Sequence, residues 1–329
     1  MMQNHAASPY YLCQNIWKFN NILSILLRLM KECNKMAYYN HLQNLHTHTT
    51  YCDGINTPEQ IILTAIDKGF GSIGFSGHSY MYYSEGHSMS LEGTEKYKAE
   101  ISRLKNKYRD QIDIFCGLEF DMYSEIELKG YDYLIGSVHY LKCDDKLVGF
   151  DRSDKEVKNV IDTYFDGDGM KYARAYYQTL AELPNHGDFD IIGHFDIISK
   201  HSENVKFFDE TSDKYKSLVL EAADALRGRI PIFEVNTGAI ARGYRTTPYP
   251  SIFIMKELKN MGFGVCITSD CHDVRYLECG FSDGSELLRE CGFREKFILT
   301  ECGFVSVCGN YTVNMIGAEK PFLRTTIRS

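Results

Sequence analysis

From about residue 42 to residue 270, short apolar segments alternate with longer amphipathic ones, and this alternation restricts the fold more than any other feature. Strand-like segments end at residues 45–48 and span 72–76, 112–119, 131–139, 189–194, 231–236 and 264–270. Helices are expected at 57–69, 90–108, 209–227 and 249–261, and helical segments follow a loop within 141–185. Repeated strand–helix units predict an α/β protein with a parallel sheet buried on both faces. Seven such units in one chain of this length predict a closed or nearly closed barrel.

Composition narrows the class of protein. A chain of 329 residues with 44% hydrophobic content is long enough for one large core or two modest ones. The net charge of -8 argues against a general nucleic-acid binder. Eleven cysteines without any Cys-x-x-Cys pair or compact spacing fit reduced thiols. We therefore expect a cytoplasmic enzyme with no nucleic-acid or membrane partner, whose oligomeric state the sequence leaves open.

The two ends of the chain are expected to lie outside the barrel. Residues 1–38 contain the apolar run 22–27, which is too short to span a bilayer and lacks a signal-peptidase site after it. We expect Met36 to be the natural start, so that the residues before it are either an upstream over-read of the coding sequence or a disordered extension. An extra docked helix is the alternative. Residues 39–308 are expected to form the barrel, closed by a helix and a strand within 281–308. Residues 309–329 are expected to form a loose tail.

Metal-ligand residues gather at the ends of the predicted strands. His46 and His48 are one residue apart, so an extended segment places both imidazoles on one face. A single such pair is common by chance, but ligand-type residues also follow other strands. They are His78, Glu119, His139, His194, Asp270 and His272, with Asp53 in the turn after the first strand. Because the carboxyl ends of parallel barrel strands meet at one mouth, we expect all nine to converge.

The chemistry of this set points to metal ions. Imidazole and carboxylate without thiolate suit zinc, iron or manganese at water-bearing positions. Nine ligands are too many for one ion and fit two or three divalent ions. Cys52, Cys116 and Cys271 lie beside ligands, so a cysteine nucleophile is the rival mechanism. It is disfavoured because no phosphate-cradling loop accompanies them, and we expect core or supporting thiols instead.

The ordered motifs resemble those of the polymerase-and-histidinol-phosphatase (PHP) family over about residues 42–305. The motifs are His46–Thr49, Gly77-His78, Gly117–Glu119, Gly136–His139, Gly193–Asp196 and Ser269–His272. Thr50–Gly54 and Glu234–Thr237 make the chain most similar to the histidinol-phosphatase branch. The resemblance implies a distorted (β/α)7 barrel with a trinuclear metal site at the C-terminal ends of the strands. It also implies hydrolysis of L-histidinol phosphate to L-histidinol and phosphate in histidine biosynthesis.

The resemblance also implies an assignment of ligands to ions. His46, His48, Glu119 and Asp270 would hold the first ion. Glu119 would bridge to the second, completed by His139 and His194, and Asp53, His78 and His272 would hold the third. Asp53 stands where many members have histidine, which should harden the third position. A hydroxide generated between the first two ions would attack phosphorus, with Glu119, Asp270 and His139 acting through it.

Three basic residues are candidates for binding the phosphate group. Lys200 follows the fifth strand, and Arg242 and Arg245 lie in the loop after the sixth. Arginine can bind phosphate through two parallel hydrogen bonds, whereas lysine acts as a point charge. Each of the three could equally be a solvated surface charge.

Other polar residues are expected to lie outside the site. His186 and His201 have no strand-end position and are expected at the surface, and Asp196 is expected to support or cap rather than to bind metal. Glu85 and His87 are taken as exposed, with contact to the substrate's amine or imidazole as the alternative.

Two other functions remain open from the sequence. A related phosphoesterase could act on another monoester or on nucleotides. A metal-dependent C–N hydrolase, or a domain that only binds, is disfavoured by the complete ligand set and by the lack of a strand-end lysine.

Overall fold

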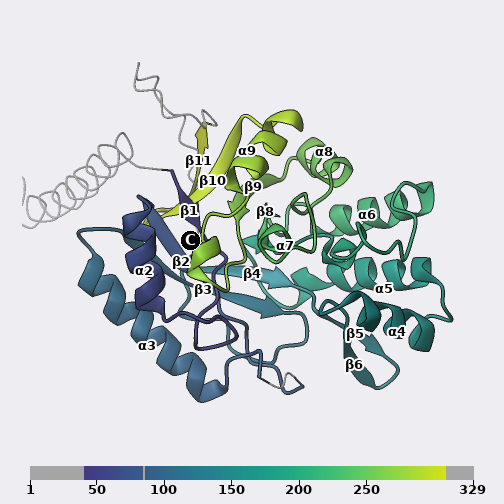
Figure 1. Cartoon of the computed structure of the whole chain (residues 1–329), viewed down its shortest axis with the longest axis horizontal. Helices are drawn as coiled ribbons and strands as arrows, with labels where there is room; N and C mark the ends of the chain where they lie inside the picture. The colour runs from purple at the N-terminus through teal and green to yellow at the C-terminus, as the bar shows by residue number, and fades with distance from the viewer. Residues whose placement is uncertain (1–40, 84–85, 309–329) are drawn as a thin grey trace, which may run out of the picture. The chain divides into compact units, whose positions relative to one another are not determined.

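Seven parallel strands form the centre of the fold (Figure 1). The computed structural model describes residues 41–83 and 86–308, so the predictions for 1–38 and 309–329 lie outside the described residues. In spatial order the strands are β1 (Gln43–Asn44), β2 (Ser72–Phe75), β3 (Asp113–Asp121), β4 (Tyr133–Ser137), β7 (Ile191–Ile192), β8 (Ile232–Asn236) and β9 (Gly264–Thr268). All neighbouring pairs are parallel, as the alternating sequence pattern predicts.

The two edge strands, β1 and β9, are joined by backbone hydrogen bonds just beyond their C-terminal ends. The Cys271 amide donates to the His46 carbonyl at 2.9 Å, and the His48 amide donates to the Cys271 carbonyl at 2.8 Å. Thr47 and Cys271 form one isolated parallel bridge there. The sheet is therefore a nearly closed barrel whose seam lies at the mouth, and the predicted fold class is confirmed.

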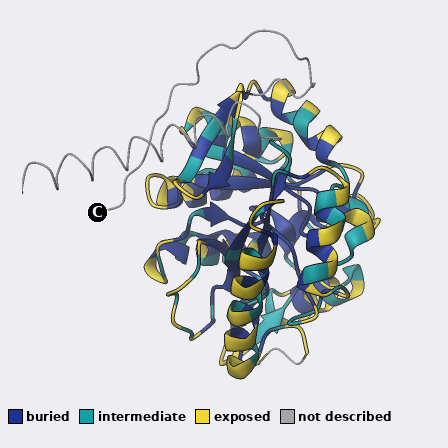
Figure 2. Ribbon diagram, turned by 90° about the vertical axis from the view of Figure 1, so that its left-hand side faces the viewer, coloured by how far each residue is buried: buried dark blue, intermediate teal, exposed yellow. Residues whose placement is uncertain are grey.

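Helices surround this sheet, with their buried faces turned inward and their exposed faces outward (Figure 2). They are α2 (Pro58–Asp67), α3 (Leu91–Tyr108), α4 (Asp154–Tyr164), α5 (Gly169–Ala181), α6 (Asp213–Leu226), α7 (Gly238–Ala241), α8 (Ile252–Asn260) and α9 (Phe281–Glu290). Capping residues fix several starts: Thr57 and Gln60 form a capping box on α2, and the Ser90 hydroxyl accepts from Gly93 on α3. Every helix of the described residues is too short or too polar to cross a bilayer.

The barrel interior is filled by a small cluster of its own, separate from the larger core between strands and helices. Tyr133 lies at its centre, where its hydroxyl donates to the carbonyls of Leu45 and Phe75. A Cβ at Gly117 would lie 2.2 Å from Cζ of Tyr133, so only glycine leaves room for the ring. The interior is thus a packed core rather than a channel.

A hairpin covers the N-terminal end of the barrel, where one closing strand was expected. β10 (Glu295–Thr300) and β11 (Gly303–Cys308) pair antiparallel, and Phe297 and Phe304 pack against the interior cluster. Gln43 joins this hairpin to β1, because its amide accepts from the Leu299 amide and donates to the Leu299 carbonyl, both at 2.8 Å.

A second hairpin stands at the opposite end, where the sequence predicted only a loop. β5 (Tyr140–Cys143) and β6 (Lys146–Gly149) pair antiparallel directly after His139. Asp144 in the turn has φ 53°, a left-handed conformation that aspartate tolerates better than most residues. The hairpin brings the segment from Gly149 to Arg152 back to the mouth.

Candidate metal centre

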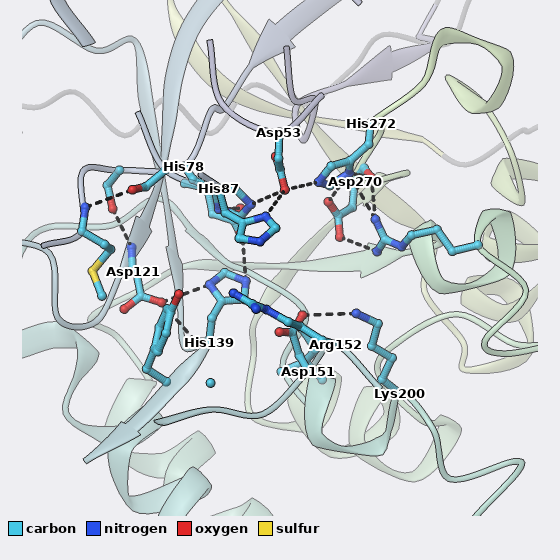
Figure 3. A pocket seen from close by; sticks show the side chains of 18 of the residues that line it. Asp53, His78, His87, Asp121, His139, Asp151, Arg152, Lys200, Asp270 and His272 are labelled. Atoms are coloured by element: carbon cyan, nitrogen blue, oxygen red, sulfur yellow. Dashed lines mark hydrogen bonds and ion pairs between the residues drawn. The ribbon is translucent and has the colours of Figure 1, made fainter. Parts of the chain in front are cut away.

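A cavity of about 390 Å³ opens at the C-terminal ends of the strands (Figure 3). Six of the nine predicted ligands line it: Asp53, His78, Glu119, His139, Asp270 and His272. The other three, His46, His48 and His194, lie beneath its floor and are almost completely buried. The structure therefore brings all nine side chains into one group, contributed by segments more than two hundred residues apart.

The histidine pair after β1 faces two carboxylates. Nε2 of His46 lies 3.2 Å from Oε2 of Glu119, and Nε2 of His48 lies 3.4 Å from the same oxygen. Oδ1 of Asp270 lies 3.2 Å from Nε2 of His48 and 3.7 Å from Nε2 of His46. Both imidazoles thus point to one side, as alternate positions of an extended segment require.

A second group surrounds the other oxygen of Glu119. Oε1 of Glu119 lies 2.9 Å from Nε2 of His194 and 3.4 Å from Nε2 of His139. The two Nε2 atoms are themselves 3.1 Å apart. Nδ1 of His139 lies 3.1 Å from Oδ2 of Asp121, so its proton belongs on Nδ1 and its Nε2 presents a lone pair to His194. A cation bound beside both nitrogens satisfies this arrangement.

A third group lies at the seam around Asp53. Oδ2 of Asp53 lies 3.3 Å from Nε2 of His272 and 3.6 Å from Nε2 of His78. Gly54 allows the tight turn that presents Asp53, because a Cβ there would lie 2.4 Å from the His48 carbonyl carbon. His87, half exposed at the rim, comes within 3.7 Å of the same oxygen, so it lines the cavity instead of facing only solvent.

Asp270 has an unusual backbone that aims its carboxylate. Its φ is 45°, in the left-handed region that aspartate enters more readily than most residues. Oδ1 faces the histidine pair, while Oδ2 accepts from Nη2 of Arg242 at 3.0 Å. One carboxylate oxygen of Asp270 therefore faces the ligand histidines, and the other binds Arg242.

The donor atoms fit divalent metal ions. Among the described residues, five buried atoms of this group have no hydrogen-bond partner: Nε2 of His46, Nε2 of His48, Oδ1 of Asp53, Oε2 of Glu119 and Nδ1 of His194. Buried polar atoms are normally paired, so such a concentration indicates a missing partner that accepts lone pairs. Donor atoms lie within 4.8 Å of one another in three sets, namely His46/His48/Asp270, His78/Glu119/His139 and His48/Asp53/His78/His272.

The electrostatics of the cluster keep Glu119 and His48 in metal-binding forms, whereas neighbouring carboxylates outweigh burial and raise the pKa of His46 and His78. Burial pushes the pKa of Glu119 upward, but His46, His78 and His139 outweigh it and hold the pKa well below the usual value. Burial, reinforced by His272 and His78, lowers the pKa of His48 to about 3, so this imidazole is neutral at neutral pH. Ionised carboxylate and neutral imidazole are the forms that bind metal.

The cysteine alternative loses support in the structure. Burial raises the pKa of Cys52, and it raises the pKa of Cys116 and Cys271 to about 12. None of these three lines the cavity. Because the thiolate is the nucleophilic form, buried thiols of this kind are poor nucleophiles.

Lys200 and Arg242 line the cavity, but Arg245 does not. Nζ of Lys200 lies 3.1 Å from Oδ2 of Asp151. Arg245 is buried and donates to the Ser199 carbonyl at 2.7 Å, to the Ser199 hydroxyl at 2.8 Å and to the Thr247 carbonyl at 3.2 Å. We therefore correct its predicted role from phosphate binding to support of the loop.

The placement of the remaining predicted residues is mixed. His186 is exposed as expected, whereas His201 is buried and packs edge-on against Tyr244, so its predicted surface position is wrong. Asp196 is buried, and its Oδ2 accepts from the Ser251 amide at 3.2 Å, a supporting contact. Glu85 lies outside the described residues.

Sequence reasoning missed several residues of the site. Arg152, Asp151 and Tyr244 line the cavity from loops. Asp121 and Glu234 contact metal-ligand histidines from within strands. The available signal for these two was an acidic side chain inside an otherwise apolar strand, which is costly unless it is paired.

Barrel and cluster together define an α/β-barrel protein with a candidate multinuclear metal centre at its mouth. The sequence matches the PHP domain over residues 44–238, more than half of the chain. The chain therefore belongs to the PHP domain family, which confirms the predicted family.

The sequence relatives of this chain are named histidinol-phosphatases. A probable histidinol-phosphatase of Deinococcus radiodurans is 27% identical, covering 76% of this chain and 93% of that protein. The histidinol-phosphatase of Bacillus subtilis is 28% identical, covering 70% and 94%. The fold matches a solved histidinol phosphate phosphatase of Lactococcus lactis, in complex with zinc, L-histidinol and phosphate, with a TM-score of 0.60. That match is 19% identical and covers 82% of this chain and 97% of that one.

Proposed function

We propose that this protein is a histidinol-phosphatase that hydrolyses L-histidinol phosphate to L-histidinol and phosphate. The observation that carries the proposal is the convergence of nine imidazole and carboxylate side chains, several with unpartnered buried atoms, at the mouth of a PHP barrel. The relatives named histidinol-phosphatase support the choice of substrate, since the chain covers more than nine-tenths of each. This substrate would place the reaction in histidine biosynthesis, for which a cytoplasmic location is expected.

The three donor sets support two or three divalent ions, with zinc, manganese or iron as candidates. His46, His48 and Asp270 would hold one ion together with Glu119. Glu119 would also serve the second with His139 and His194, and Asp53, His78 and His272 the third. Bound ions supply Lewis-acid activation of water and neutralisation of phosphoryl charge.

The protein's own residues then bind and orient the ester. Arg242 and Lys200 offer positive charge on the cavity wall, and Arg152 adds a third candidate cation. Asp151 holds Lys200 at 3.1 Å, and Nζ lies 5.0 Å from the centre of the Tyr244 ring, so this cation is fixed before substrate arrives. A cavity of about 390 Å³ lies within the range typical of small-molecule sites.

Phosphate release from histidinol phosphate tests the proposal against nucleoside monophosphates and an aryl phosphate, with metal content measured on the same sample. We expect histidinol phosphate to have the highest kcat/KM and the sample to contain at least two ions per chain. His139→Ala serves as the inactive control. Comparable kcat/KM for all the esters would overturn the substrate assignment, and full activity of metal-free protein would overturn the metal assignment.

A further inference from the structure

Glu234 is a fully buried carboxylate in the middle of β8 that accepts four hydrogen bonds. Oε2 accepts from Nδ1 of His46 at 2.9 Å and from the Thr268 hydroxyl at 2.7 Å. Oε1 accepts from the backbone amide of His194 at 2.7 Å and from Nδ2 of Asn236 at 2.8 Å. Three of these donors belong to the segments of β1, β7 and β9, and the fourth belongs to β8 itself. The carboxylate therefore has all its acceptor positions occupied and is held rigidly.

We propose that Glu234 is a positioning residue that orients ligands of two metal positions at once, His46 through its imidazole and His194 through its backbone. The inference rests on the proposed metal centre and adds to it a residue that touches neither metal nor substrate. The Glu234 carboxylate thereby links a ligand of the first metal position to a ligand of the second.

The argument for His46 is one of proton placement. An ionised carboxylate can only accept, so Nδ1 of His46 must carry the proton. Nε2 then presents its lone pair toward Oε2 of Glu119 and Oδ1 of Asp270, the side on which it has no hydrogen-bond partner among the described residues. Carboxylates that hold the far nitrogen of a metal-binding histidine fix its ring and raise its basicity.

The argument for His194 is one of backbone placement. β7 contains only two residues, Ile191 and Ile192, so little sheet pairing holds the chain that follows it. The short contact from the His194 amide to Glu234 fixes the backbone at the residue whose Nε2 lies 2.9 Å from Glu119. Without it, the backbone at His194 keeps, among the described residues, the hydrogen bonds from the Gly193 amide to the Gly136 carbonyl and from the Ile197 amide to the His194 carbonyl.

Asp121 offers a matched control. Its Oδ2 contacts Nδ1 of His139 at 3.1 Å and accepts from the His139 amide at 3.1 Å, while Oδ1 accepts from the Tyr123 amide. It is also a buried carboxylate inside a strand end, but it contacts only one of the ligand histidines. Removing its charge should therefore disturb one metal position, whereas removing that of Glu234 should disturb two.

The test compares Glu234→Gln with Asp121→Asn in the full chain. Zinc stoichiometry and affinity are measured by chelator competition, and folding by circular dichroism. We expect Glu234→Gln to weaken zinc binding at two positions by about 10–100-fold and Asp121→Asn at one position only. A folded Glu234→Gln protein that binds as much zinc as the wild type, with the same affinity, overturns the proposal.

Two further measurements keep the test decisive if Glu234→Gln does not fold. Glu234→Asp keeps the charge but withdraws it by one methylene, and we expect weaker zinc binding in this folded variant as well. In metal-free wild type, proton NMR should show a downfield imidazole N–H resonance that is absent in His46→Gln and retained in Asp121→Asn. Absence of this resonance from the wild type overturns the proposal whatever the variants do. Failure of histidinol phosphate as substrate, with zinc binding altered as expected, overturns only the proposed function.

Discussion

Arg242 and Arg245 belong to one loop and carry the same charge, yet their guanidinium groups meet different partners. Arg242 lies on the cavity wall beside Asp270 and His272, with part of its side chain exposed. Arg245 is buried against Ser199 and Thr247. At the scale of the residue, position relative to the cavity decides the role, and the identity of the side chain does not.

We expect Arg242→Met to raise KM for the phosphate ester by at least tenfold, because a hydrogen bond to a charged group contributes about 1.5–3 kcal/mol. We expect Arg245→Met to leave KM near the wild-type value and to lower the free energy of unfolding by about 1–3 kcal/mol, since it leaves the buried Ser199 carbonyl without this donor. Steady-state kinetics and urea denaturation of both variants check this. A rise in KM for Arg245→Met alone would reverse the two assignments.

The sequence predicts which ligand residues converge but not what holds them. His46, Glu119 and Asp270 were recognisable because ligand-type residues at strand ends share one mouth in a parallel barrel. The roles of Asp121 and Glu234 were not recognisable, although Glu234 belongs to a motif of the predicted branch, since a buried acid inside a strand reveals its partner only when the fold is known. Arg245 shows the reverse error, because loop membership does not determine which way a side chain points.

At the scale of elements, the helices predicted at 57–69, 90–108, 209–227 and 249–261 correspond to α2, α3, α6 and α8, whereas the short helix α7 and the two hairpins were not predicted as such. The turn of β5–β6 is Asp144-Asp145, which lacks the Asn-Gly or Asp-Gly pattern that identifies a two-residue hairpin. The hairpin β10–β11 was expected as one strand. Neither hairpin belongs to the strand–helix repeat from which the barrel was predicted, so the pattern carried no information about them.

Lys296 on β10 makes the stability of the covered barrel end depend on pH. Burial lowers its pKa from 10.5 to about 8, and its ammonium donates to the His41 carbonyl. Between pH 8 and 10.5 the unfolded chain therefore binds more protons than the folded one, and this group's contribution to stability rises with pH. We expect the free energy of unfolding of the wild type, relative to Lys296→Met, to increase from pH 7.5 to pH 10.

Urea denaturation at several pH values measures this difference. Lys142→Met, on the exposed side of β5, is the control for general effects of alkaline pH. A difference between wild type and Lys296→Met that stays constant, or that falls as pH rises, would contradict the prediction.

At the scale of the whole described barrel, closure and metal binding involve the same segments. His46 and His48 follow β1, Asp270 and His272 follow β9, and the seam bridge joins Thr47 to Cys271 between them. Ions held by both sides would add links to the hydrogen bonds that already cross this seam, such as those from the His48 amide to Cys271 and from the Asn44 side chain to Ser269. The fold class was predictable from the repeat, but the position of this seam was not, because it depends on where the two edge strands end.

Removal of metal should therefore destabilise the protein, and the seam most of all. A ligand at a thousand times its Kd stabilises the folded state by about 4 kcal/mol. We expect chelation to lower Tm by several degrees, and to increase hydrogen exchange at the amides of His48 and Cys271 more than in the β3–β4 ladder. Asp270→Asn, which keeps a residue suited to the left-handed backbone, should show a smaller change in Tm on chelation. Equal protection of seam and ladder amides in both states would contradict this coupling.

The hairpin beneath the barrel has a consequence for turnover. Since β10, β11 and the packed ring of Tyr133 fill the far end, the described residues leave the cavity open at the C-terminal ends of the strands and closed toward the hairpin. The inorganic phosphate released deep inside must leave by the route through which the next ester enters, after the alcohol has vacated it. The proposed enzyme should thus release its two products in a fixed order, with the alcohol first and phosphate last. Phosphate should then compete with the incoming substrate for the site.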